Sequence, residues 1–150
     1  PIKTIIIGRQ RVRFIVNKHT KEIPTTELKT KQGHVLISTV EATAFDLVRF
    51  YKKSGGYSHI ATVFLEIGSK INVTKLGKIA DIYNDTPLTQ RVGYLLEKFG
   101  SVKSISEFHN WLKTRDCSFK RLSGKRNGEE LARNQKWFLI VDIAVEPDEL

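Results

Sequence analysis

Few of the residues that build disulfides, thiol metal sites or membrane spans occur in this chain. Its 150 residues include a single cysteine, Cys117, so the chain has no internal disulfide and no cluster of thiol ligands. The longest apolar runs, such as residues 5–7, are only a few residues long, whereas a transmembrane helix needs about 20. The opening residues lack the apolar stretch of a secretory signal. These absences favour a cytoplasmic protein and argue against a membrane partner.

The overall composition is that of a globular domain. Hydrophobic residues make up 40% of the chain and charged residues 27%, which argues against intrinsic disorder. At this length we expect residues 1–150 to form a single domain. The chain begins at Pro1 rather than at a methionine. We therefore expect further residues upstream in the native protein.

Positive charge dominates and is unevenly distributed. The chain has 25 Lys and Arg against 16 Asp and Glu, for a formal net charge of +9. Residues 1–75 hold 13 basic and 5 acidic side chains. A second basic stretch, residues 113–136, is masked by an acidic C-terminus. The two stretches form either one positive face or two, and they serve either to attract phosphate backbones or to maintain solubility alone.

The candidate nucleic-acid-binding residues lie in a predicted hairpin and in a predicted strand and basic loop. Residues 4–16 have the pattern of a β-hairpin with Gly8-Arg9 at its turn, in which Arg11 and Arg13 share one face. The sequence shows no pattern for reading particular bases. The full set of candidates is Arg9, Arg11, Arg13, Lys120, Arg121, Lys125, Arg126 and Arg133.

Apolar periodicity predicts a central block of helices. A capping box at residues 38–41 predicts a helix through Lys53, and a second box at residues 104–107 predicts one through Leu112. Between them, Thr86 is the expected cap of the most strongly periodic helix, with Pro87 at its first position and Gly100 as its stop. The remaining predicted helices cover residues 58–67 and 72–83.

Short strands are predicted at both ends of the chain. Residues 35–37, 119–122 and 137–145 have strand patterns, whereas residues 18–32 are interpreted as a loop or irregular strand and residues 123–134 as a basic loop. We therefore predict an α+β fold in which the N- and C-terminal strands pair into one mixed or antiparallel sheet. That sheet would pack against a central block of four to five helices.

Recognisable catalytic motifs are missing from the sequence. The four histidines have no partner at the spacing of a helical zinc site, and Cys117 has no neighbour that would activate its thiol. Phosphate-binding glycine loops are also missing. We therefore predict no catalytic residues, no metal and no cofactor. An alternative is a metal-dependent, nuclease-like enzyme that processes nucleic acid with Glu27, Glu41 or Asp46 and a divalent ion.

Structural roles are expected for several charged and aromatic residues. Arg91 is predicted to form a bidentate bond with a carboxylate, on a neighbouring helix or at Glu41 or Asp46. Gly93 lies inside a helix, where a glycine costs about 1 kcal/mol relative to alanine, which indicates a close backbone approach. Both tryptophans, at positions 111 and 137, are interpreted as core aromatics.

Four segments in order resemble the C-terminal domain of AbiEi-type antitoxins, which belong to type IV (abortive infection) toxin–antitoxin systems. They are residues 38–47, 55–56, 91–100 and 134–137, and the resemblance runs from about residue 35 to about residue 145. The most specific block is Arg-Val-Gly-Tyr-Leu-Leu-Glu-Lys-Phe-Gly at residues 91–100. The motif residues are Glu41, Thr43, Asp46, Arg91, Gly93, Tyr94, Glu97, Asn134 and Trp137.

The resemblance implies a bacterial or archaeal antitoxin of phage defence that is a regulator rather than an enzyme. Its partner would be a nucleotidyltransferase-like toxin encoded beside it and counteracted without a stable complex. Many family members also carry an N-terminal winged helix that binds operator DNA and represses the operon. Nothing before Thr4 supplies a recognition helix, so we expect the basic stretches only to assist DNA binding. A pure protein-interaction module, with charge for solubility alone, remains a third hypothesis.

Overall fold

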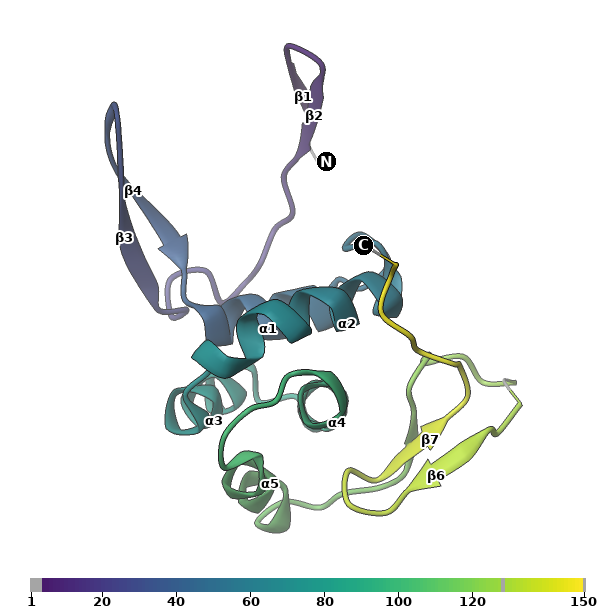
Figure 1. The fold of residues 1–150 in the computed structure, drawn as a ribbon. Helices are drawn as coiled ribbons and strands as arrows, with labels where there is room; N and C mark the ends of the chain where they lie inside the picture. The colour runs from purple at the N-terminus through teal and green to yellow at the C-terminus, as the bar shows by residue number, and fades with distance from the viewer. Residues whose placement is uncertain (1–3, 128, 150) are drawn as a thin grey trace.

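The computed structural model describes residues 4–127 and 129–149. These residues form five α-helices in the middle of the chain, with short strands before and after them (Figure 1). The helices are α1 (Val40–Arg49), α2 (Gly56–Ile67), α3 (Val73–Tyr83), α4 (Thr86–Phe99) and α5 (Ile105–Lys113), with a short 3₁₀ turn at Gly68–Lys70. The α+β class and the central helical block are therefore confirmed. No described helix is long and apolar enough to cross a membrane.

The strands form three separate small sheets rather than one. β1 (Thr4–Ile7) pairs with β2 (Gln10–Arg13), and β3 (Thr25–Thr30) pairs with β4 (Gly33–Ser38). At the other end of the chain, β7 (Leu139–Val141) lies between β5 (Lys120–Arg121) and β6 (Ala132–Asn134). The predicted joining of N- and C-terminal strands does not occur, because both hairpins project from one side of the helical block and the C-terminal sheet lies on another (Figure 1).

The first hairpin is formed as the sequence predicts, and the second is more regular than expected. Ile5 pairs with Val12 across β1 and β2, and the turn begins at Gly8, whose φ of +60° suits a tight hairpin turn. Residues 25–30, predicted as loop or irregular strand, form a regular strand. Their side chains are exposed, so β3 lacks the apolar alternation by which a strand is recognised.

The helix starts are close to those predicted, but the caps differ. Thr39, rather than Ser38, caps α1, and its hydroxyl accepts a hydrogen bond from the Ala42 amide at 3.4 Å. Asp85, rather than Thr86, caps α4 by accepting from the Leu88 amide at 2.9 Å. At α5, Ser104 adopts a left-handed conformation and makes no side-chain cap bond. Neither predicted capping box is therefore formed.

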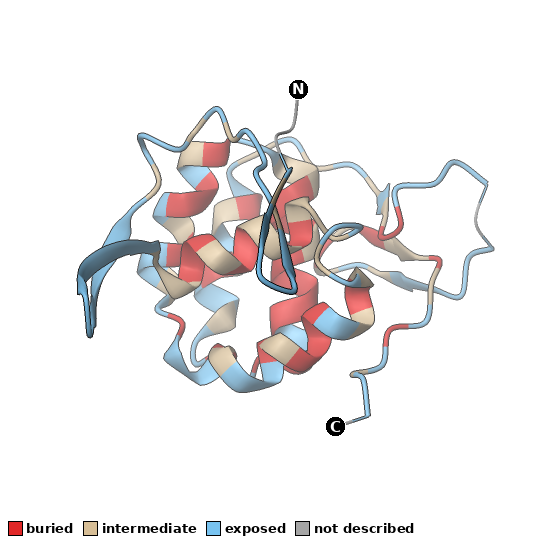
Figure 2. Cartoon of the chain, turned by 90° about the horizontal axis from the view of Figure 1, so that it is seen from above, coloured by how far each residue is buried: buried red, intermediate tan, exposed pale blue. Residues whose placement is uncertain are grey.

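The core is built from the helices and the C-terminal sheet. Phe45, Ile60 and Leu95 are fully buried in the helical block, and Trp137 and Leu139 complete this core from the far end of the chain. Buried residues concentrate in the helices, whereas both hairpins are almost entirely exposed (Figure 2). Both tryptophans were expected in the core, and only Trp137 is buried there. The half-buried Trp111 donates its indole N–H to Asp81 at 2.7 Å.

Candidate functional site

Two sequence blocks that lie far apart in the chain meet where Trp137 packs on α4. A methyl group built at Gly93 would lie 2.0 Å from the nearest ring carbon of Trp137, so only glycine allows this approach. One turn further along α4, Glu97 accepts a hydrogen bond from the Trp137 indole N–H at 2.7 Å. The close approach predicted at Gly93 is therefore confirmed, and its partner is the buried indole.

The turn before β7 holds this tryptophan in place. The Asn134 side-chain oxygen accepts a hydrogen bond from the Trp137 amide at 2.8 Å, and the Lys136 ammonium pairs with Glu97. Burial acts to raise the pKa of Glu97, but the hydrogen bonds from Lys136 and Trp137 outweigh it and hold the pKa below its usual value. Glu97 is therefore a charged carboxylate that fastens the C-terminal segment to α4.

Arg91 anchors the C-terminal sheet, but not through the carboxylate that the sequence predicts. Its Nε and Nη2 both donate to the backbone carbonyl of Arg121, at 3.3 and 2.9 Å. The hydroxyls of Tyr57 and Tyr51 donate to the next two carbonyls, at 2.9 and 3.0 Å. Three consecutive carbonyls, those of residues 121–123, are thus held by side chains of the helical block.

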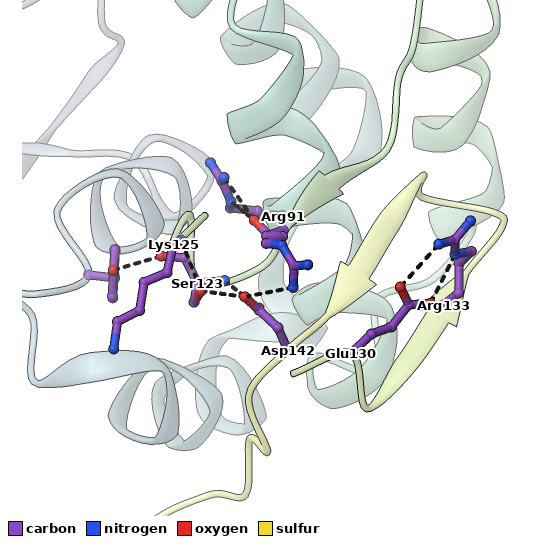
Figure 3. Close-up of polar contacts among 8 residues, drawn as sticks. Arg91, Ser123, Lys125, Glu130, Arg133 and Asp142 are labelled. Atoms are coloured by element: carbon purple, nitrogen blue, oxygen red, sulfur yellow. Dashed lines mark hydrogen bonds and ion pairs between the residues drawn. The ribbon is translucent and has the colours of Figure 1, made fainter. Parts of the chain in front are cut away.

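Asp142, directly after β7, fixes the same segment (Figure 3). Its carboxylate accepts from the Ser123 amide at 2.9 Å and from the Ser123 hydroxyl at 2.5 Å, and Arg121 lies 3.8 Å away. Burial acts to raise the pKa of Asp142. The hydrogen bonds from Ser123 and the charge of Arg121 lower it further than burial raises it, so the pKa lies below its ordinary value.

The carboxylates on α1 bind to other parts of the fold. Glu41 is buried and accepts from the Asn72 amide at the start of α3, at 3.0 Å. Asp46 accepts from the Tyr83 hydroxyl at 2.5 Å and from Asn17 at 3.4 Å. Burial, followed by the bond to Asp46, raises the pKa of Tyr83 above its usual range.

The three carboxylates of the nuclease hypothesis are not brought together. Glu27 is exposed on the β3–β4 hairpin, whereas Glu41 is buried between α1 and α3. The neighbouring α1 carboxylate, Asp46, is bound by Tyr83. Throughout residues 4–127 and 129–149, no three His, Cys, Asp or Glu side chains gather in a way that would hold a metal. The remaining α1 motif residue, Thr43, shares a hydrogen bond with Ser38 at 2.8 Å.

The sequence of the chain matches the family model of the AbiEi antitoxin C-terminal domain over residues 2–98. The chain belongs to the AbiEi antitoxin C-terminal domain family. No curated protein and no solved structure matches it. The domain therefore has an antitoxin role in a toxin–antitoxin system, with a toxin as its partner.

The match to the AbiEi family includes the helical partners of the C-terminal segment. It ends at residue 98, so it contains Arg91, Gly93 and Glu97 but not Asn134 or Trp137. The structure shows that these two groups of residues form one contact. In this AbiEi domain the segment beyond the matched region therefore packs on a helix of the matched region.

The candidate basic residues lie in two groups on different sides of the domain. Arg9, Arg11 and Arg13 lie on the projecting β1–β2 hairpin, where Arg11 and Arg13 share a face. We call these three the hairpin group. The other candidates surround the C-terminal sheet, across the helical block from the hairpin (Figure 1). We call this the sheet group: Lys120, Arg121, Lys125, Arg126 and Arg133.

The two groups differ in how far their charge is compensated. Within the sheet group, Arg133 pairs with Glu130 at 3.1 and 3.0 Å, and Arg121 faces Asp142 (Figure 3). Lys125 and Arg126 are exposed and form no ion pair with a carboxylate of the described residues. The same holds for the hairpin group, within the part of the chain that the structure describes.

A further basic segment, Arg49–Lys53, was not identified from the sequence. It follows directly from the end of α1, which ends at Arg49 rather than at Lys53 as predicted. The guanidinium of Arg49 lies 5.6 Å from the Phe50 ring centre, and the ammonium of Lys53 lies 6.0 Å from it. The sequence pattern that could have indicated this segment is the run of adjacent basic and aromatic residues in Arg-Phe-Tyr-Lys-Lys, which is typical of nucleic-acid binding.

Proposed function

We propose that this chain is the antitoxin domain of a type IV system and counteracts a nucleotidyltransferase-like toxin encoded beside it. The observation that carries the proposal is the family match over residues 2–98. The role is regulatory and cytoplasmic, without catalysis and without a stable complex with the toxin. Glu41 accepts a hydrogen bond from the start of α3, and Asp46 accepts one from Tyr83. Because both carboxylates are bound within the fold, they support the non-catalytic assignment.

The hairpin and sheet groups assist DNA binding for repression of the operon and so contribute to the response to phage. They also engage the RNA on which the toxin acts, so the counteraction of the toxin depends on them as well. A two-stranded antiparallel ribbon fits the major groove of B-DNA, and the β1–β2 hairpin projects from the domain with Arg11 and Arg13 on one face. Exposed cations without carboxylate partners bind phosphates by displacing condensed counterions. Phosphate contacts of this kind position a protein on a duplex without specifying its sequence.

Co-expression with the toxin tests the antitoxin role. The toxin gene next to the native gene is expressed from an inducible promoter in bacteria that also express this chain, and growth is measured. We expect toxin induction alone to stop growth and co-expression of the chain to restore it. Gly93→Trp places a large side chain against Trp137, so we expect it to destabilise the fold and reduce the rescue; it serves as the control for loss of folded chain.

Two results would contradict the proposal. One is growth arrest that persists although the folded chain is present at a level equal to the toxin or above it. The other is metal-dependent cleavage of DNA or RNA by the purified chain that is abolished by Asp46→Asn. The second result would instead establish the nuclease-like alternative.

A further inference from the structure

The Phe50 side chain, directly after α1, lies in an environment unlike that of Phe45 within the helix. Phe45 is fully buried, whereas Phe50 is only partly buried. Among the described residues, Phe50 is not one of the apolar side chains packed against the central core, and no other aromatic ring stacks on it. Its ring therefore contributes little to the core and remains available for another contact.

Two cations lie beside the Phe50 ring and a third lies beside the neighbouring Tyr51 ring. Arg49 lies between the rings of Phe50 and Tyr83, 5.6 and 5.0 Å from their centres. Lys53 lies 6.0 Å from Phe50, and Lys52 lies 5.8 Å from Tyr51. No carboxylate of residues 4–127 or 129–149 forms an ion pair with Arg49, Lys52 or Lys53. These three charges are therefore free to bind an anion.

A hollow of about 310 Å³ opens beside the ring, between α1 and the segment that precedes β3. Its volume lies at the lower end of the range for small-ligand pockets, about 300–1,000 Å³. Phe50, Leu47 and Ile15 give it an apolar wall. The Oδ2 atom of Asp46 supplies an acceptor, because Tyr83 and Asn17 bind only the Oδ1 atom of that carboxylate. Lys53 also lines the hollow, so a cation stands beside the aromatic wall.

We propose that the Arg49–Lys53 segment binds single-stranded nucleic acid. A base enters the hollow and stacks on Phe50, with its polar edge toward Asp46, and the adjoining phosphates bind Arg49, Lys52 and Lys53. An aromatic face beside unpaired cations is the usual platform for single strands. The bases of a duplex are stacked on one another and do not offer a free face to such a wall.

This inference goes beyond the proposed function and does not depend on it. The segment lies at the end of α1 and contains none of the residues of the hairpin group or the sheet group, although Tyr51 contacts Ser123 beside the sheet group. The single-strand site is tested in solution with the chain alone, whereas the antitoxin role is tested by growth. The failure of the single-strand site would therefore leave the antitoxin role untouched, and the failure of the antitoxin role would leave the site untouched.

Fluorescence anisotropy of a short labelled oligothymidylate tests the site. At low salt we expect the full chain to bind it, and Phe50→Leu to weaken binding about tenfold, because an aromatic platform contributes about 1–3 kcal/mol per stacked base. Lys53→Gln should make the slope of log affinity against log salt shallower by about 0.7, the value for one phosphate contact on a single strand.

Matched controls locate the effect. Phe119, like Phe50, has an arginine beside its ring, with Arg133 at 5.0 Å, but it belongs to the C-terminal sheet region. Phe119→Leu and the exposed α3 variant Lys78→Gln should therefore leave binding unchanged. Circular dichroism and thermal melting confirm that each variant is folded.

Three results would overturn the proposal. The first is no binding of the oligothymidylate by the full chain at low salt. The second is unchanged affinity for a folded Phe50→Leu variant, or an equal loss for Phe119→Leu. The third is binding of a duplex of equal length with the same affinity and the same loss in Phe50→Leu. The third result would assign the segment to duplex binding through charge.

Discussion

The contact between Gly93 and Trp137 illustrates how much one residue position determines in this fold. A glycine inside a helix that is otherwise strongly periodic predicts that something approaches the backbone at that point. The sequence does not say what approaches, because the indole comes from a turn after three intervening elements, α5, β5 and β6. The structure supplies both the partner and the Glu97 carboxylate that orients it.

Gly93→Ala should destabilise the domain, although alanine favours a helix by about 1 kcal/mol. The new methyl group would overlap the Trp137 ring, and overpacking of this kind costs about 1–3 kcal/mol, occasionally more. Urea unfolding followed by tryptophan fluorescence measures the difference. Gly77→Ala on α3 is the matched control: its methyl group would have no neighbour within 4 Å, so we expect stabilisation. Equal stabilisation by both substitutions would contradict this account of Gly93.

At the scale of secondary-structure elements, helices are predicted more faithfully than strands. The helices are recognised because apolar residues recur with the helical period on a buried face, as in α4. β3 is missed because both of its faces are exposed, which removes the alternation. The capping box at residues 104–107 is not formed because Ser104 adopts a left-handed conformation, and the box at residues 38–41 is not formed because of Glu41. Glu41 finds a better partner in the α3 start than in its own helix.

The anchoring of the C-terminal sheet by Asp142 should make stability depend on pH. Its pKa is lower in the folded state than in the unfolded state, so its contribution is complete above the unfolded value of about 4. That contribution is lost as the pH falls through the folded value. We therefore expect the unfolding free energy of the wild type to fall between about pH 5 and pH 3.

Asp142→Asn isolates this effect. The variant keeps the side-chain shape but removes the titrating group, so its unfolding free energy should be lower at neutral pH and should change less with acidity. Urea unfolding at a series of pH values measures both. A variant with the same pH profile as the wild type would show that Asp142 does not contribute in this way.

At the scale of the whole molecule, the sequence predicts the family and the presence of two basic stretches but not their arrangement. Whether Arg11 and Arg126 share a face depends on how the hairpin and the C-terminal sheet sit on the helical block, and no local pattern encodes that. The structure places them in separate groups. Arg91 shows the same limit. An arginine at this position predicts an anchoring contact, but its partner is a backbone carbonyl, which every residue has, so the sequence does not indicate which residue it binds.

The proposed function requires the exposed cations of the hairpin and sheet groups to meet a polyanion. Growth rescue by a variant with Arg11→Glu, Arg13→Glu, Lys125→Glu and Arg126→Glu tests it most directly. These four side chains are exposed, so the variant should melt at the same temperature as the wild type. We predict that this folded variant fails to restore growth when the toxin is induced. Full rescue by the folded variant would contradict the claim and favour an antitoxin that acts through protein contacts alone.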